Sequence, residues 1–363
     1  MDGSTVYFSK MFQAVPHLAQ VAEELPGVFV TTRRSTLKAV RHLYPDVETA
    51  FLSKYLGPFS SGKRCLKKAQ VIVTGSPYRS FLEPYQAKKA SVFHGTYMML
   101  SRDQLLRNSH FDLLCTIGPR MQDMIGRFAD ISLNTVQTGF LPFCEYPVQS
   151  PEQRVSVLEG MGLNPAYKTI LYTSSRRGLG SWNQVAEQLV LTAPSHFNLV
   201  LRPHPSQSLT PRQRDRQSFA RVQKLVAERP GALMDLGSQS LANLMSVADL
   251  MVSDANSPSE ESLFYDVPQM FIETESLSRD FMRDLGVQES MHPDDLERLL
   301  TLYDCGPSHF IKAVPNFSES LERAIDDATL YAQQREAYFA SVFGSRDRSA
   351  NQRVARAIKH HVF

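Results

Sequence analysis

The sequence predicts an α/β protein made of two doubly wound domains, each a parallel sheet with helices on both faces. Short apolar runs ending at Gly, Ser or Thr alternate with amphipathic helical patterns along most of the 363 residues. Such runs suit strands that are covered on both faces, as in a parallel sheet. The alternation stops at 141–154, where prolines occur without periodicity, and then starts again. Since a chain of this length ordinarily forms two domains, we expect the linker there.

The first half of the chain, 1–145, carries the first expected domain. Its apolar, β-rich runs predict strands at 6–9, 27–32, 69–75, 90–96, 112–118 and 134–140. The patterns with helical spacing predict helices at 17–25, 35–43 and 119–128.

The second expected domain covers 155–340. Strands are expected at 168–175, 197–205, 231–237, 249–254 and 267–273, and helices at 182–191, 216–228, 240–248 and 257–266. The pattern is helical from 316 onward. Residues 341–363 are expected to form a C-terminal helix that can pack back on the first domain.

The composition narrows the function classes. Hydrophobic residues make up 42% and charged residues 21%, as in a globular protein with a full core. The net charge of +2 argues against nucleic acid as a partner, and the basic clusters at 33–34, 62–68, 212–221 and 346–356 have the pattern of solvated helix faces.

Cysteine spacing and hydropathy predict the compartment. The four cysteines lie far apart without a CxxC pair, so we expect reduced thiols and no zinc site. No apolar run approaches 18 residues, and the first residues lack a signal-peptide pattern. The expected location is the cytoplasm, with any membrane contact peripheral and at the inner face.

Unusual polar residues follow four of the expected strands. In doubly wound sheets, ligands bind beyond the carboxyl ends of the strands, here in an expected cleft between the domains. The candidates at these ends are His94, Gly95 and Thr96; Ser174, Ser175 and Arg177; Arg202 and His204; and Ser253, Asp254, Asn256, Ser257 and Ser259, with Glu261 further along. Arginine and serine with few carboxylates suit phosphate oxygens.

The stretch 253–264 predicts a helix that starts at a strand end. Ser257 suits the N-cap, Pro258 the first helical position, and Glu260 completes a capping-box pattern. The free N–H groups of that first turn form an anion site, so we expect phosphate binding here. The alternative is a well-capped helix without a ligand.

Two histidines are candidate catalytic residues. His94 precedes Gly95, which permits close approach of a ligand, and an imidazole can take a proton from a hydroxyl. His204 stands between Pro203 and Pro205, which hold it on a stiff segment. The alternatives are a core histidine for His94 and a strand-ending turn for His204. His17 is a weaker candidate for a ligand contact, and because no DxD motif occurs, no metal or other cofactor is expected.

Several ordered motifs resemble one known family. "SVFHGT" (91–96), "LRPHP" (201–205), "DLMVSDANSPSEESLFYDVPQMFI" (249–272) and "DRSANQR" (347–353) resemble the CDP-glycerol glycerophosphotransferases, the teichoic acid and capsule polymerases with a GT-B fold. The likeness runs from about residue 90 to 355. The sequence departs from the family pattern at Met99, Ala255–Asn256 and Arg348.

The resemblance implies a transferase with a CDP-linked donor and a glycan or lipid-linked acceptor. An acceptor hydroxyl would attack the phosphate that carries the polyol, and CMP would leave. His94 matches the family's base, Arg202 and His204 its RxHP residues, and Ser253, Asp254, Ser257 and Ser259 its donor-phosphate region. Arg177 matches an arginine after the first strand of the second domain. Two alternatives stay open: a nucleotide-sugar glycosyltransferase of capsule or lipopolysaccharide synthesis, and a catalytically silent nucleotide-binding partner of a polymerase complex.

Overall fold

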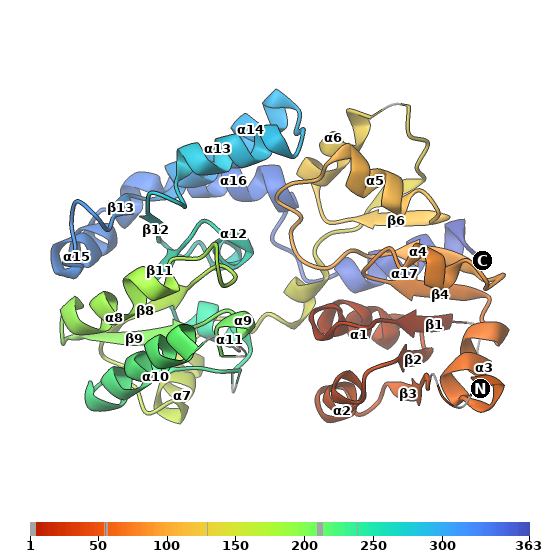
Figure 1. Cartoon of the computed structure of the whole chain (residues 1–363), viewed down its shortest axis with the longest axis horizontal. Coiled ribbons are helices and arrows are strands. Elements are labelled where there is room, and N and C mark those ends of the chain that lie inside the picture. The colour runs from red at the N-terminus through yellow and green to blue at the C-terminus, as the bar shows by residue number, and fades with distance from the viewer. Residues whose placement is uncertain (1–4, 54, 56, 129, 209–212, 238) are drawn as a thin grey trace. The chain divides into compact units, whose positions relative to one another are not determined.

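The chain folds into two compact units. A computed structural model describes residues 5–53, 55, 57–128, 130–208, 213–237 and 239–363. Unit 1 comprises Met1–Glu145 with Ala340–Phe363, and unit 2 comprises Tyr146–Phe339. Each unit has its own sheet and its own core (Figure 1).

Unit 1 holds a parallel sheet whose strand order, over the residues described, is β3-β2-β1-β4-β5-β6-β7. The interior strand β1 is completely buried at Val6, Tyr7 and Phe8, which explains its continuous apolar sequence. The strands are β1 Thr5–Phe8, β2 Val28–Thr31, β3 Glu48–Phe51, β4 Val71–Thr74, β5 Lys88–Ser91, β6 Leu113–Thr116 and β7 Thr135–Gln137.

Helices connect these strands, and the last helix of the chain joins them. They are η1 Phe12–Ala14, α1 Val15–Glu24, α2 Arg34–Leu43, η2 Gly57–Phe59, α3 Ser61–Lys68, α4 Arg79–Leu82, α5 Arg102–Asn108, α6 Pro119–Gly126, η3 Leu141–Glu145 and α17 Ala350–His361. α17 packs against α1, where Val354 and Ile358 enter the same core as Leu18 (Figure 1).

The motif at 347–353 anchors α17 to unit 1. The Arg353 Nε donates to the Thr138 carbonyl at 2.6 Å, and its Nη1 lies 2.9 Å from the Asp347 carboxylate. A Cβ added to Gly139, at φ +98°, would lie 2.5 Å from the Arg353 Nη2. The local role of this motif is therefore structural.

Unit 2 repeats the architecture with strand order β10-β9-β8-β11-β12-β13 among the described residues, all parallel. The strands are β8 Lys168–Thr173, β9 Phe197–Arg202, β10 Ala232–Met234, β11 Leu250–Ser253, β12 Gln269–Glu273 and β13 Ser308–Phe310. The helices are α7 Pro151–Gly160, α8 Trp182–Thr192, α9 Pro205–Ser208, α10 Gln213–Glu228, α11 Leu241–Ser246, α12 Ser257–Ser262, η4 Leu263–Tyr265, α13 Arg279–Gln288, α14 Pro293–Leu300, η5 Thr301–Cys305, α15 Ser318–Asp326, η6 Ala328–Tyr331 and α16 Ala332–Phe343, of which the part after Phe339 belongs to unit 1.

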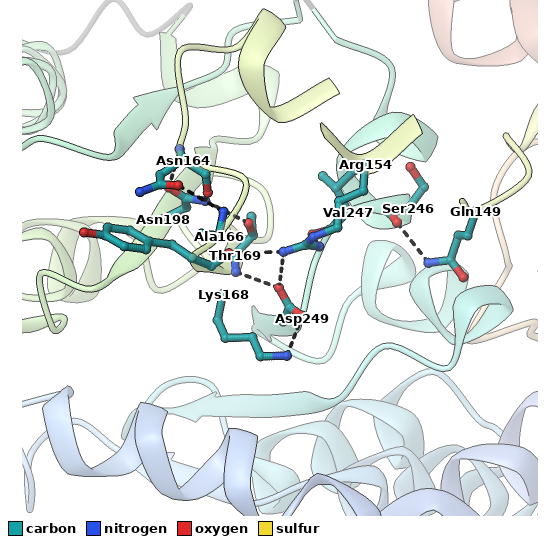
Figure 2. A network of polar contacts seen from close by, with 11 residues as sticks. Gln149, Arg154, Asn164, Ala166, Lys168, Thr169, Asn198, Ser246, Val247 and Asp249 are labelled. Carbon is teal, nitrogen blue, oxygen red and sulfur yellow. Dashed lines mark hydrogen bonds and ion pairs between the residues drawn. The ribbon is translucent and has the colours of Figure 1, made fainter. Parts of the chain in front are cut away.

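A polar network holds the amino ends of the unit 2 strands (Figure 2). The Arg154 guanidinium donates to the Asp249 carboxylate at 2.7 Å and to the Val247 carbonyl at 2.5 Å. Asp249 also accepts the Thr169 amide at 2.8 Å and the Lys168 ammonium at 3.2 Å. These side chains satisfy one another, so the network stabilises this edge and leaves ligand binding to the opposite, carboxyl edge.

The predicted doubly wound α/β architecture is confirmed, while several element boundaries differ. β5 ends at Ser91, so the expectation that His94 lies on a strand is wrong: the chain leaves the sheet three residues earlier, and Phe93 has a left-handed φ of +56°. In the part of the chain that the structure describes, no helix is both long enough and apolar enough to cross a membrane.

Candidate functional site

The carboxyl ends of β8 and β11 form the topological switch point of unit 2. From this neighbouring pair the strand order runs outward in both directions, through β9 and β10 on one side and through β12 and β13 on the other. Such a point is where open α/β sheets bind ligands. Ser174 directly follows β8, and Ser253 is the last residue of β11. Both side chains are buried, with 4% exposure for Ser174 and 0% for Ser253. Both Oγ atoms are buried and neither has a hydrogen-bond partner among the described residues, which marks them as candidate donors at this strand edge.

Asp254, the residue after Ser253, is engaged with the loop at 174–181. Its Oδ2 accepts the amides of Ser175 at 2.6 Å and Ser181 at 3.0 Å, and its Oδ1 accepts the Ser181 hydroxyl. Burial raises the pKa of Asp254, although these hydrogen bonds act in the opposite direction. The loop doubles back tightly, because a Cβ on Gly180 would lie 2.4 Å from the Ser175 carbonyl oxygen. Asp254 thus shapes the loop that carries Ser174, Ser175 and Arg177.

The helix that follows β11 starts one residue earlier than expected. Ala255 is left-handed, with φ +50°, and Asn256 takes the N-cap position, its Oδ1 accepting the Ser259 amide at 3.3 Å. The expected N-cap at Ser257 and its capping box are therefore wrong, because the turn at Ala255 already reverses the chain. Glu260 instead accepts the Tyr338 hydroxyl at 2.6 Å.

The start of α12 uses most of its own polar groups. Asn256 Nδ2 donates to the Thr173 carbonyl at 3.3 Å, and the Ser259 hydroxyl donates to the Asn256 carbonyl at 2.5 Å. Ser257 is half-buried at the first helical position. Since α12 has only six residues, its dipole is a weak source of anion affinity. Ser174 and Ser253 are the better candidate donors.

His204 lies just past the end of β9 and is held in one tautomer. Its Nδ1 accepts the Ser206 amide at 3.1 Å and lies 2.8 Å from the Ser206 hydroxyl. Burial, together with the nearby charge of Arg176, lowers the pKa of His204, so the ring is neutral at pH 7. A neutral ring whose Nδ1 accepts a backbone N–H carries its proton on Nε2. His204 can therefore donate a hydrogen bond to a ligand through Nε2.

The two predicted phosphate-binding arginines have different surroundings. The Arg177 amide donates to the Ser206 hydroxyl at 2.9 Å, and its buried Nη1 has no hydrogen-bond partner in the described part of the chain. Its Nε lies 3.9 Å from Asp215. Arg202, in contrast, forms an ion pair with the fully buried carboxylate of Asp235 and donates to the Gln239 carbonyl at 3.2 Å. Arg177 is the freer of the two for an anion.

Glu261 on α12 titrates near neutrality. Burial raises its pKa to about 7, against the hydrogen bond from the Tyr146 hydroxyl at 3.1 Å, and the neighbouring Glu260 adds to the rise. A carboxyl whose pKa is higher in the folded state stabilises the fold below about pH 4.5, and that contribution is lost as the pH rises toward 7.

We expect Glu261→Gln to remove this loss. Between pH 5 and pH 8 the free energy of unfolding of the wild-type protein should fall by about 1–2 kcal/mol relative to that of the variant. The melting temperatures of both proteins at pH 5 and at pH 8 measure this difference. Glu289→Gln, at an exposed position, is the matched control. Parallel pH profiles for wild type and Glu261→Gln would contradict the expectation.

His94 of unit 1 lies in the loop after β5 and has the opposite tautomer. Its Nδ1 lies 2.5 Å from the carbonyl oxygen of Gly75, and 3.3 Å from the hydroxyls of Ser76 and Tyr97. A carbonyl oxygen only accepts, so Nδ1 carries the hydrogen, and in this tautomer the electron pair is on Nε2. That nitrogen can accept a proton from a hydroxyl.

The loop around His94 is held in an unusual backbone conformation. Phe93, Gly95 and Tyr97 all have left-handed φ angles, of +56°, +82° and +49°. For Phe93 and Tyr97, which have a Cβ, such conformations cost free energy, and they are concentrated at functional sites. Gly95 has open space where a Cβ would be, and its amide donates to His17 Nε2 at 3.4 Å. The adjacent Thr96 is buried, and its carbonyl accepts the Arg120 guanidinium at 3.0 Å.

His17 acts as a support for this loop. It is 6% exposed, and burial, with the nearby His94, lowers its pKa to about 3. It therefore stays neutral and accepts the Gly95 amide. Its burial gives it a positioning role instead of the ligand contact considered from the sequence.

Some residues of these sites could not be inferred from local patterns. Ser181, Ser206, Asp235 and Gly75 each bond to a predicted site residue. The glycine-rich "GLGS" at 178–181 was the one available signal, for the tight loop that Asp254 holds. Over the described residues, no group of three or more His, Cys, Asp or Glu side chains could hold a metal ion.

Comparisons with known proteins identify the fold. No family model and no curated protein matches the sequence. Among solved structures, the wall teichoic acid polymerase TagF, in a variant soaked with CDPG, matches with a TM-score of 0.67 at 14% identity, covering 99% of this chain and 89% of that one. HepE of Anabaena, in complex with UDP and glucose, matches at 0.56 and 12%, covering 98% and 99%. The sucrose-phosphate synthase of Thermosynechococcus elongatus matches at 0.55 and 12%, covering 98% of each chain.

These likenesses confirm the predicted GT-B type of α/β fold. They also confirm, for the fold, the expected resemblance to the CDP-glycerol glycerophosphotransferases, since TagF matches over 99% of the chain. At 12–14% identity they establish architecture alone.

Proposed function

We propose that the protein is a transferase that moves a polyol phosphate from a CDP-linked donor to a hydroxyl of a growing cell-surface glycan or teichoic-acid-like polymer. The observation that carries the proposal is the opposite tautomers of His94 and His204. One imidazole tautomer has its electron pair on Nε2, and the other has its proton there. A group transfer from a diphosphate needs both: a base for the acceptor and a hydrogen-bond donor for the departing phosphate.

In the proposed step, His94 Nε2 takes the proton of the acceptor hydroxyl. The acceptor oxygen attacks the phosphorus that carries the polyol, and a new P–O bond forms. The bond from that phosphorus to the bridging oxygen breaks, and CMP leaves with the bridging oxygen and its electron pair. His204 Nε2–H then stabilises the negative charge that develops on CMP.

Unit 2 is proposed to hold the donor. Ser174 and Ser253, both buried and without protein partners in the described residues, would donate to the diphosphate, together with the free Nη1 of Arg177. Asp254, Asn256 and Ser259 would keep these groups in place, because their own polar atoms are used within the protein. No metal is part of the proposed step.

The main alternative is transfer of a sugar from a nucleotide donor. HepE, whose structure contains UDP and glucose, shares the fold, and the donors at the ends of β8, β9 and β11 would serve a sugar nucleotide equally well. The acceptor oxygen would then attack a sugar carbon, and the nucleotide would leave with both phosphates. A silent nucleotide-binding partner is less favoured, since it has no use for the strained loop that orients His94.

The identity of the nucleotide separates these functions. We expect the full-length protein to bind CDP and CMP more tightly than UDP and GDP in calorimetric titrations, and to release CMP from CDP-glycerol when an acceptor is present. Chromatography of the nucleotide products provides the reading. Release of a nucleoside diphosphate from a sugar nucleotide would instead establish the glycosyltransferase, and binding without turnover of any donor would establish the silent partner.

A further inference from the structure

Unit 1 contains a cavity at its own topological switch point. The strand order reverses between β1 and β4, and the cavity of about 620 Å³ is lined by Lys10, which follows β1, and by residues 77–81, which follow β4. This volume falls in the range of small-molecule sites. The position obeys the same rule as the site in unit 2, although no motif in the sequence pointed to it.

The cavity lies beside the candidate base. Gly75 accepts the Nδ1–H of His94, and Ser76 lies within 3.3 Å of the same nitrogen. The next residues, Pro77 and Tyr78, line the cavity. One short segment, residues 75–78, thus runs from the contacts of the imidazole to the cavity wall.

The lining of the cavity is cationic. Lys10, Arg79 and Arg107 face a single lining carboxylate, Glu83. None of the three cations has an ion pair with a carboxylate in the described part of the chain. The Lys10 ammonium lies 5.1 Å from the centroid of the Tyr78 ring and 4.7 Å from that of Phe81, which holds it without neutralising it.

The aromatic wall of the cavity is rigid. Phe81 stacks on Phe8 with a centroid distance of 4.4 Å, and Tyr78 packs edge-on against the same ring at 5.3 Å. The Tyr78 hydroxyl accepts the Lys10 amide at 3.2 Å. The backbone of Tyr78 is left-handed, with a φ of +39°. A preformed wall of this kind fits the C–H face of a polyol or sugar, while the cations fit an anionic group.

We propose that this cavity binds a phosphate group of the acceptor and thereby directs the acceptor hydroxyl to His94. The inference rests on the proposed function and specifies the chemistry of its acceptor, a phosphorylated polyol or glycan end. Arginine side chains favour phosphate because their planar N–H groups match its oxygens.

Binding of sn-glycerol 3-phosphate to the full-length protein tests the inference without catalysis. In calorimetric titrations, Lys10→Met/Arg79→Gln should weaken binding by about tenfold or more, since two charge-assisted contacts are lost. The matched control, Arg33→Gln/Lys38→Met, removes the same charge from two exposed positions of the same unit, the N-cap and the second turn of α2, and should change the affinity less than twofold. Glycerol, which has no charge, should not bind measurably at the same concentrations.

A single substitution of opposite sign keeps the test independent of folding. Glu83→Gln, at an exposed position, removes the one lining carboxylate and should strengthen glycerol 3-phosphate binding by about twofold to threefold. Equal affinity in wild type and Lys10→Met/Arg79→Gln, an equal loss in the control, or no binding to wild type would overturn the inference. CDP titrated into the same proteins tests the donor site separately, so failure of the cavity and failure of the proposed function are distinguishable.

Discussion

His94→Ala should lower turnover by about a hundredfold or more at saturating donor and acceptor, because it removes the base that takes the acceptor proton. The affinity for CDP should stay nearly unchanged, since the proposed donor contacts belong to unit 2. The melting temperature should stay within a few degrees of wild type, because His94 is half-buried and contributes one hydrogen bond to the carbonyl of Gly75. Turnover from CDP-glycerol, calorimetry with CDP and thermal melting provide the three readings.

His204→Ala should fail in a different way. Its Nε2–H is proposed to meet the donor phosphates, so CDP binding should weaken by about tenfold, with a smaller loss of turnover at saturating donor. His360→Ala, at an exposed position on α17, is the matched histidine control and should leave both readings unchanged. Full turnover in His94→Ala, or unchanged CDP affinity in His204→Ala, would remove that histidine from the mechanism.

The architecture could be predicted because strands that are buried on both faces have continuously apolar sequences. β1, β4, β6 and β11 are completely buried runs, and their continuous apolar sequences indicated strands covered on both faces. β3 was missed because only Ala50 of its four residues is buried, as the edge position in the sheet allows. The short edge strand β13, with only His309 buried, was missed for the same reason.

The chemistry of the site could be predicted only in part. The polar residues at the strand ends could be recognised from their residue types. Whether these side chains are free or already engaged depends on partners that are far away in the sequence. Asp254 is engaged by Ser181, 73 residues earlier, and Arg202 by Asp235, 33 residues later. The tautomers of His94 and His204 follow from contacts with backbone atoms of Gly75 and Ser206, which the sequence does not display. Left-handed Phe93 and Ala255, which set the loops, have no residue signature.

Arg202→Met should destabilise the protein by about 2–3 kcal/mol, because it leaves the Asp235 carboxylate buried without its cation. The Asp235 side chain is fully buried, whereas the Arg202 side chain is 25% exposed, so the expected cost lies at or below the lower end for buried pairs. The carboxylate would keep the amides of Gly237, at 3.3 Å, and Gln239, at 3.2 Å, which support it only partly. Urea unfolding of wild type and variant measures the difference.

The double variant Arg202→Met/Asp235→Asn tests whether the cost comes from the unpaired charge. Removing the carboxylate charge as well should restore about 1–2 kcal/mol of the loss, and the coupling between the two positions should be correspondingly large. CDP affinity decides the role of Arg202 toward the donor. If the arginine serves mainly to hold Asp235 and the segment at 235–239, the folded double variant should bind CDP within about threefold of wild type. If Arg202→Met were as stable as wild type but bound CDP tenfold more weakly, Arg202 would be a phosphate ligand and the ion pair with Asp235 incidental.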